Sequence, residues 1–384
     1  MSAAGCLDIT ITRGAGAGNR VDLSSTRPVH ACRVFKEQPF QQALALMPRL
    51  FAVCATAQEV AGWRAVEQAR GTDPEPAVEA GREFLVQLET AREHLWRVVV
   101  DWPEFLGEPA RPEYARRVHA LMGPAKQTLN EGGWGRSGQP DRVIDELCEM
   151  LDELVFRRHP GAWSGLDDLE RLQRWWQQTP TVAARLLRSV SENGWERAGA
   201  AETCFLPDLD WRDLNQKLRS ERGDRFVEQP RWQQGACETT PLARQRHTPL
   251  MQSLLAEYGA GLLTRLAAQL QELARTPEVL RALVGGFAAE ADWPGGIRSS
   301  CGDGCGISQV EAARGRLIHR VELDGEKVRR YQIVAPTEWN FHPDGVVSGA
   351  LRTLAGETDD DVRQQADLLV TAIDPCVDYR LEVH

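Results

Sequence analysis

The chain has 384 residues, 42% hydrophobic and 26% charged, which is typical of a globular protein and excludes a disordered or collagen-like chain. Its 45 Lys and Arg residues are outnumbered by 55 Asp and Glu residues, which gives a formal net charge of −10. Because nucleic-acid binding requires a cationic surface, this balance argues against a nucleic-acid partner.

The nine cysteines form no CxxC pair, and their number is odd, so the sequence predicts neither a disulfide framework nor a zinc ribbon. The first thirty residues contain no apolar run of the kind found in signal peptides. No stretch approaches the roughly 18 uninterrupted apolar residues of a transmembrane helix, so no membrane span is expected. Reduced thiols without an export signal predict a cytoplasmic location.

The N-terminal segment, residues 1–38, is expected to be extended. Leu7, Ile9 and Ile11 alternate with polar residues, and this is the spacing of a strand. The glycine-rich stretch 14–18 then interrupts the alternation. It lacks the GxGxxG spacing of a phosphate-binding loop, so we interpret it as a turn.

Residues 39–294 have the apolar spacing of a helical body, with hydrophobic residues recurring every three or four positions. Thr179 followed by Pro180 is typical of a helix start, with a capping side chain and a proline in the first turn. The predicted helices span 39–47, 55–70, 76–100, 112–130, 140–157, 166–178, 180–193, 248–275 and 277–290.

Residues 295–384 differ in character, because glycines are followed by two alternating apolar runs, Leu317–Leu323 and Val328–Val334. Asp324-Gly325 joins these runs, and a DG pair between alternating runs predicts a β-hairpin. Thr358 is expected to begin a last helix, with Asp361 completing a capping box. The expected fold is therefore mainly α with a small C-terminal α+β portion, and the three segments are expected to form one composite domain.

The sequence contains none of the common catalytic motifs, such as HExxH, GxSxG or a Walker loop. Cys301 and Cys305 lie four residues apart in the glycine-rich loop and could ligate a metal. No second close pair supports such a site, so their role stays open. The histidines are better explained as surface or core residues than as ligands.

Five short segments nevertheless share a fixed order along the chain: Arg49–Gln58, Pro241–Arg244, Glu311–His319, Pro336–Asn340 and Asp374–Cys376. Together they resemble the large subunit of nickel–iron hydrogenases, which has R-x-C-G-x-C-x-x-x-H, GPLAR, EAPRG-type, P-[ST]-x-W-N and DPCxxCxxH segments in this order. The resemblance implies an abbreviated form of the helical fold of that subunit.

The departures from that family concern its metal ligands. In the family, four thiolates hold nickel, and two of them bridge to an iron that carries cyanide and carbon monoxide. Here each pair keeps one thiol, because Phe51 stands in place of the partner of Cys54, and Tyr379 in place of the partner of Cys376. Gln58 replaces a histidine. A four-thiolate centre cannot be built from two thiols, so hydrogen turnover is not expected and the protein is predicted not to be an enzyme; whether nickel binds stays open.

The resemblance implies that the residues around the iron ligands are retained. Cys54 and Cys376 are the implied metal ligands, Arg314 and Thr337 match the donors to the two cyanides, and Pro336 keeps the backbone turn. Low-spin Fe(II) with three diatomic ligands needs only one or two further donors, and thiolates suit it. Structural roles stay open as alternatives: Arg314 could anchor a loop by an ion pair, Thr337 could cap a turn, and Cys376 could be a buried inert thiol.

The pattern of one thiol per pair is similar to that of the HupK/HoxV-type hydrogenase maturation proteins. This resemblance implies a scaffold that assembles an Fe(CN)2(CO) unit and passes it to the hydrogenase large subunit, with HypC/HypD-type chaperones as further partners. No tail follows the last motif, so no proteolytic removal of an extension is expected. The alternatives are a non-metal chaperone for hydrogenase subunits and, less favoured, a residual metalloenzyme.

Overall fold

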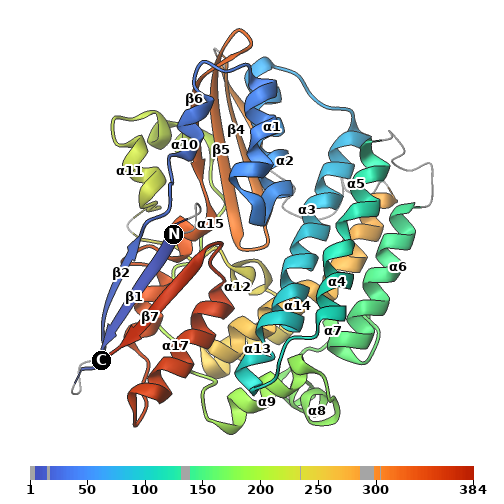
Figure 1. Cartoon of the computed structure of the whole chain (residues 1–384), viewed down its shortest axis with the longest axis vertical. Coiled ribbons are helices and arrows are strands. Elements are labelled where there is room, and N and C mark those ends of the chain that lie inside the picture. The colour runs from blue at the N-terminus through green and yellow to red at the C-terminus, as the bar shows by residue number, and fades with distance from the viewer. Residues whose placement is uncertain (1–4, 15–17, 131–138, 234, 286–297, 303) are drawn as a thin grey trace. The chain divides into compact units, whose positions relative to one another are not determined.

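The structure is a computed structural model, and it describes residues 5–14, 18–130, 139–233, 235–285, 298–302 and 304–384 (Figure 1). The chain divides into two compact units. Unit 1 combines Met1–Pro74, Ala201–Ala243 and Pro294–His384, and unit 2 combines Glu75–Ala200 and Arg244–Trp293. Each unit is thus assembled from stretches that are distant in the sequence.

A three-stranded sheet in unit 1 joins the two ends of the chain (Figure 1). β1 (Cys6–Thr12) pairs antiparallel with β2 (Arg20–Ser25) and parallel with β7 (Asp378–Val383). The alternation of β1 is confirmed, because Leu7, Ile9 and Ile11 are buried while Asp8 and Thr10 between them are partly exposed. The strand β7 was not predicted from the sequence.

A four-stranded antiparallel sheet forms the centre of unit 1, in the order β3 (Arg298–Gly302), β4 (Cys305–Ala312), β5 (Gly315–Asp324) and β6 (Lys327–Val334). The predicted hairpin is confirmed as β5 and β6. Its turn residue Gly325 has a φ of 58°, a conformation that glycine adopts without steric cost.

The helix α2 (Ala55–Arg70) packs closely against β4. A Cβ atom on Gly306 would lie 2.0 Å from the carbonyl oxygen of Ala65, so only glycine permits this approach. The hydroxyl of Ser308 donates a hydrogen bond to the carbonyl of Ala61 at 2.6 Å. Because α2 covers one side of the sheet and apolar residues cover the other, every residue of β4 is buried.

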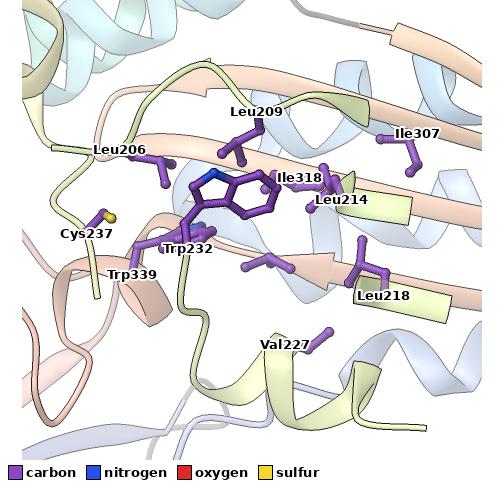
Figure 2. Close-up of a cluster of buried hydrophobic side chains, with 11 residues drawn as sticks. Leu206, Leu209, Leu214, Leu218, Val227, Trp232, Cys237, Ile307, Ile318 and Trp339 are labelled. Atoms are coloured by element: carbon purple, nitrogen blue, oxygen red, sulfur yellow. The ribbon is translucent and has the colours of Figure 1, made fainter. Parts of the chain in front are cut away.

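Those apolar residues form the cluster of Figure 2, to which the sheet, α15 and the stretch 201–243 all contribute. The sequence predicted no helix in that stretch, but α10 (Trp211–Arg219) and α11 (Gly223–Glu228) lie within it. Each large side chain buried here stabilises the fold by roughly 1.5–3 kcal/mol. The cluster consists of Leu206, Leu209, Leu214, Leu218, Val227, Trp232, Cys237, Ile307, Ile318, Val334 and Trp339.

The last helix of unit 1, α17 (Asp359–Ile373), begins as the sequence predicted. The Thr358 amide donates to the Asp361 carboxylate at 2.8 Å, and the Asp361 amide donates to the Thr358 hydroxyl at 3.1 Å. These reciprocal bonds are the capping box. The other helices that begin in unit 1 are α1 (Phe40–Leu50), α12 (Pro241–Gln245), α15 (Pro336–Asn340) and α16 (Val346–Arg352).

Unit 2 is helical over the residues that the structure describes. Its helices are α3 (Pro76–Trp96), α4 (Pro112–Ala120), α5 (Met122–Asn130), α6 (Gln139–Leu151), α7 (Pro160–Ser164), α8 (Leu169–Gln178), α9 (Val182–Glu192), α13 (Pro249–Tyr258) and α14 (Leu262–Val284). The mainly α fold with a small sheet portion is confirmed.

The predicted helices 248–275 and 277–290 were divided at the wrong place. The chain breaks after α13, where Gly259 has a φ of 64° and a Cβ atom on Gly261 would lie 2.4 Å from the carbonyl oxygen of Glu196. The helix α14 instead continues through Pro277. An interior proline costs a helix about 3 kcal/mol, and the burial of most of α14 offsets this cost.

Among the described residues, no single helix is long and apolar enough to cross a membrane. Phe40–Leu50 and the following helical stretch Ala52–Arg70 meet the length and composition requirement only when they are taken together, and a bend of 101° separates them.

Candidate functional site

The two predicted ligand thiols lie at the ends of helices in unit 1. Cys54 is the residue immediately before α2, and Cys376 lies in the turn between α17 and β7. Both side chains are partly exposed, and neither cysteine forms a disulfide bond. Each thiol is therefore partly accessible to solvent.

The sulfur of Cys376 accepts hydrogen bonds from two side chains. The Thr337 hydroxyl donates to it at 3.0 Å, and the guanidinium of Arg27 donates to it as well. The backbone amide of Cys376 in turn donates to the Thr337 hydroxyl oxygen at 3.4 Å. The predicted residues Thr337 and Cys376 are therefore in direct contact.

Pro336 explains why Thr337 faces this sulfur. It occupies the first turn of α15, where a missing amide hydrogen costs nothing, and the residue before it is extended. Pro336 and Thr337 are both buried, so the start of α15 holds the hydroxyl in a fixed position.

Arg27 links the two thiols electrostatically. Its Nε lies 2.8 Å from the Oε1 atom of Glu338, and both side chains are almost fully buried. Burial acts to lower the pKa of Arg27, but Glu338, Cys376 and, more weakly, Cys54 raise it above its ordinary value. Cys54 and Cys376, from opposite ends of the chain, therefore lie within electrostatic range of one guanidinium.

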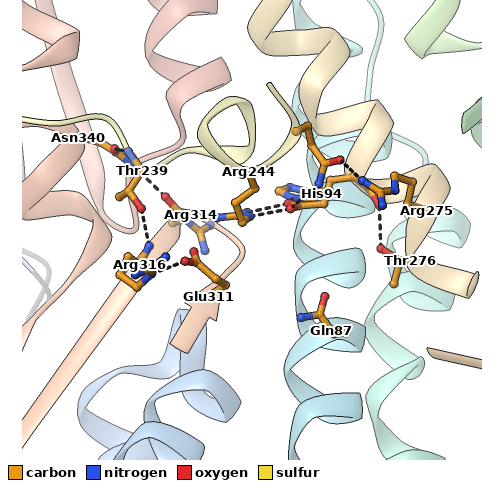
Figure 3. Close-up of polar contacts among 12 residues, drawn as sticks. Gln87, His94, Thr239, Arg244, Arg275, Thr276, Glu311, Arg314, Arg316 and Asn340 are labelled. Carbon is orange, nitrogen blue, oxygen red and sulfur yellow. Dashed lines mark hydrogen bonds and ion pairs between the residues drawn. The ribbon is translucent and has the colours of Figure 1, made fainter. Parts of the chain in front are cut away.

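Arg314 lies in the turn between β4 and β5 and forms a buried ion pair with Asp374. Its Nε lies 3.1 Å from the Oδ1 atom of Asp374, and both side chains are 3% exposed. Asn340 donates to the Arg314 carbonyl at 2.9 Å and thereby fixes the turn (Figure 3). Asp374, with a φ of 63°, is two residues before Cys376, so the ion pair joins the arginine turn to the cysteine segment. This contact is the loop-anchoring role that the sequence left open for Arg314.

A chain of buried hydrogen bonds leads away from Cys54. The Gln58 amide nitrogen lies 3.6 Å from the Cys54 sulfur, and its oxygen lies 2.9 Å from the Nε2 atom of His319. The other ring nitrogen of His319 lies 2.9 Å from the Tyr331 hydroxyl. Burial lowers the pKa of His319 to about 3, so the ring is neutral at physiological pH. We infer the tautomer that donates to Gln58 and accepts from Tyr331, because Gln58 then directs its amide N–H groups at Cys54.

At the two positions where the resemblance implies a lost thiol, Phe51 and Tyr379, no other metal-binding side chain takes its place. Phe51 directly follows α1 and offers no donor atom. The Tyr379 hydroxyl is engaged with α17, where it donates to the Asp367 carboxylate and lies 3.3 Å from the Thr371 hydroxyl. The site thus contains two sulfur atoms.

No group of three or more His, Cys, Asp or Glu side chains arranged to hold a metal ion occurs among the described residues. Cys305 is buried in β4, whereas the side chain of Cys301 lies outside the described part of the chain.

Sequence reasoning missed Arg27, Glu338 and Asp374. Two of them carried a usable signal, because Glu338 follows Thr337 directly and Asp374 belongs to the same segment as Cys376. Arg27 had no such signal, since its role depends on contacts with residues more than 300 positions away.

Comparison with known proteins places these observations in a family. The profile of nickel-dependent hydrogenases matches residues 208–378. The chain is 30% identical to the hydrogenase expression/formation protein HoxV of Cupriavidus necator, over 94% of this chain and 92% of that protein. It is 31% identical to the hydrogenase expression/formation protein HupK of Azotobacter vinelandii, over 99% of each.

The fold resembles that of hydrogenases of known structure. A [NiFeSe] hydrogenase of Desulfovibrio vulgaris Hildenborough superposes with a TM-score of 0.63 at 15% identity, covering 97% of this chain and 98% of that one. An NAD+-reducing [NiFe]-hydrogenase gives a TM-score of 0.58, also at 15% identity, covering 94% and 92%. At this identity the likeness establishes the fold alone.

Proposed function

The chain belongs to the family of HoxV/HupK hydrogenase expression/formation proteins, a maturation rather than a hydrogenase group, and we propose that it carries an Fe(CN)2(CO) unit as transient cargo. In this proposal Cys54 and Cys376 bind the iron, and the unit passes from HypC/HypD-type chaperones to the hydrogenase large subunit. The protein is not an enzyme in this role, and it acts in the cytoplasm.

The observation that carries the proposal is the environment of Cys376. Its sulfur is held by the Thr337 hydroxyl at 3.0 Å and by Arg27, and Arg27 also lies within electrostatic range of Cys54. Two thiols within electrostatic range of one cation are candidate soft donors for iron.

The donor set suits a metal that brings most of its own ligands. Two sulfurs with no third ligating side chain among the described residues are too few for a bare metal ion of ordinary coordination number. Iron with two cyanides and one carbonyl already has three ligands, so one or two thiolates complete a stable unit. This match favours cargo of that composition over free iron or nickel.

Arginine and hydroxyl groups are the donors that a bound cyanide requires. A cyanide nitrogen is an anionic acceptor, and a guanidinium forms strong charge-assisted hydrogen bonds. A guanidinium has five N–H donors, so Arg314 can bind Asp374 and a cyanide together. The Thr337 hydroxyl, next to the Cys376 sulfur, is the proposed donor to the second cyanide.

Infrared spectroscopy of protein purified from a host that makes the iron unit tests the proposal. Cyanide and carbonyl stretching bands are expected in the wild-type protein and are expected to vanish in Cys54→Ala and in Cys376→Ala. Cys148→Ala is the matched control, because Cys148 is also partly exposed but lies in unit 2. The cyanide and carbonyl bands are expected to remain in this variant. Wild-type protein without bands would refute cargo binding.

The alternative function is a chaperone for hydrogenase subunits that binds no metal. The loss of two of the four thiols, at Phe51 and Tyr379, favours it. Pull-down of hydrogenase subunits from a strain that cannot make the iron unit separates the two functions. Association as strong as in the parent strain supports the chaperone, whereas association that requires the iron unit supports the cargo role.

A further inference from the structure

Two cysteines other than Cys54 and Cys376 have their sulfur atoms close together. The Sγ atoms of Cys204 and Cys237 are 2.9 Å apart, and both thiols are free. A disulfide bond has a length of about 2.0 Å, so a movement of about 1 Å would join them.

The backbone holds these two cysteines in register. The residues that follow them, Phe205 and Glu238, form a parallel β-bridge. The Glu238 amide donates to the Cys204 carbonyl at 2.7 Å, and the Leu206 amide donates to the Glu238 carbonyl at 2.9 Å. The proximity of the sulfurs therefore follows from the paired backbones and not from the chance orientation of two flexible side chains.

The two thiols differ in accessibility. Cys204 is exposed, whereas Cys237 is 1% exposed and belongs to the hydrophobic cluster of Figure 2. Burial, together with the neighbouring Cys204, raises the pKa of Cys237 to about 12. Cys204 is therefore the thiol that meets a dissolved oxidant, and Cys237, whose sulfur lies 2.9 Å away, is placed to react with the oxidised Cys204.

The segment after Cys237 supports the arginine turn of the candidate site. The Thr239 hydroxyl accepts from the Arg316 amide at 2.7 Å, and the Thr239 amide donates to Asn340 at 2.9 Å (Figure 3). A Cβ atom on Gly315 would lie 2.1 Å from the Thr239 carbonyl oxygen. The backbone near Cys237 thus packs directly against the turn that contains Arg314.

We propose that Cys204 and Cys237 are a redox-active pair that a peroxide converts into a disulfide, and that this bond clamps the segment beneath the Arg314 turn. The Cys204 sulfur attacks the peroxide and breaks its O–O bond, which leaves a sulfenic acid and releases water. The Cys237 sulfur then attacks the sulfenic sulfur and forms the S–S bond; the S–O bond breaks, and the departing hydroxide takes the Cys237 thiol proton and leaves as a second water. The two thiols lose two electrons, and one hydrogen peroxide is reduced to two waters.

The pair is tested on the purified full-length protein with equimolar hydrogen peroxide, followed by alkylation of the remaining thiols, digestion and mass spectrometry. The expected product is a peptide containing Cys204 linked to one containing Cys237 and lighter by two hydrogens. Cys204→Ser is expected to abolish the link and leave Cys237 open to alkylation after unfolding. Cys6→Ser is the control, because Cys6 lies in β1, and it should leave the link intact. Recovery of Cys204 as an over-oxidised acid, or linked to a second molecule, with Cys237 still reduced would overturn the proposal.

Hydrogen exchange tests the clamp. The amides of Glu238, Thr239 and Arg316 are expected to exchange about tenfold more slowly in the oxidised protein, because local opening now requires a cross-linked segment to move. Cys204→Ser protein treated with peroxide should show no such slowing. Equal exchange in the reduced and oxidised wild-type protein would overturn the clamp. Neither measurement depends on whether the protein carries iron, so failure here would be distinct from failure of the proposed function.

Discussion

Unit 1 and unit 2 each bury an arginine next to a carboxylate, but the two arrangements differ in what else the arginine contacts. In unit 2, Arg244 binds Glu272 through two contacts of 2.6 and 2.7 Å, and His94 lies 2.8 Å from the same carboxylate. In unit 1, Arg27 binds Glu338 and also donates to the sulfur of Cys376.

This difference separates a structural cluster from a candidate binding site. Both oxygens of Glu272 are engaged by side chains of its own unit, and nothing in that arrangement requires a ligand. Arg27 divides its charge between a carboxylate and a thiol that a metal could bind. A buried ion pair can therefore be purely structural or part of a binding site. The additional contact of the arginine, here the Cys376 sulfur at Arg27, distinguishes the two cases.

The largest expected effect on the free energy of unfolding concerns the unit 2 cluster of Arg244, Glu272 and His94. Glu272→Gln removes the acceptor charge and leaves Arg244 buried without a full partner, so we expect a loss of about 3–5 kcal/mol in the free energy of unfolding. Asp167→Asn, which breaks the exposed pair with Arg171, is the control and is expected to cost under about 1 kcal/mol. Denaturant unfolding at pH 7 measures both. Similar values for the two variants would show that the cluster is not structural.

The same cluster predicts a dependence on acid. Burial acts to raise the pKa of Glu272, but Arg244 and His94 lower it well below its ordinary value. Because the folded-state pKa is lowered, the stabilisation is fully present above the unfolded carboxyl pKa near 4.5 and is lost as the pH falls toward the folded value. Glu272→Gln should weaken this acid dependence.

The next largest effect concerns the ion pair of Arg27 and Glu338 in unit 1, and it tests whether this pair differs in role from that of Arg244. Arg27→Gln leaves Glu338 buried without its cation, and we expect a loss of about 2–3 kcal/mol in unfolding free energy. Arg27→Lys keeps the charge and should lose less than half as much. If Arg27 also serves the thiols, the infrared bands of the cargo should weaken in Arg27→Gln. Undiminished bands would assign Arg27 a structural role like that of Arg244.

A smaller effect concerns the hydrogen-bond chain behind Cys54. Because burial lowers the pKa of His319 to about 3, the unfolded chain takes up a proton at this residue as the pH falls below 6.5, while the folded chain does not. Stability should therefore fall by about 1.2 kcal/mol between pH 6 and pH 5 on account of this residue. His319→Gln should remove that contribution. The slope that remains comes in part from His342, whose pKa burial also lowers.

The smallest effect serves as a reference for the changes in unfolding free energy, at a position outside both arginine–carboxylate pairs. Gly325→Ala introduces a side chain at a φ of 58° but meets no atom within 4 Å, so only the backbone conformation resists it. We expect a cost of about 1 kcal/mol. Gly123→Ala is the control, because this α5 glycine also has open space and no positive φ, and it is expected to stabilise slightly. A cost at Gly123 would invalidate the calibration.

The sequence by itself determined the elements whose signals are local. The Asp324-Gly325 pair predicted the hairpin, and Thr358 with Asp361 predicted the start of α17; both are confirmed, because turns and caps depend on residues only a few positions apart. The sequence also singled out Thr337 and Cys376, which the structure brings into contact.

Only the tertiary structure decided which distant residues meet. The parallel pairing of β1 with β7, the contact of Arg27 with Cys376 and the proximity of Cys204 to Cys237 join segments whose separation leaves no periodic signal. The break at Gly259 and the continuation of α14 through Pro277 depended likewise on neighbouring backbone and on burial. Spacing along a chain encodes turns, caps and apolar faces, whereas the topology of the folded chain determines which charges and sulfurs become neighbours.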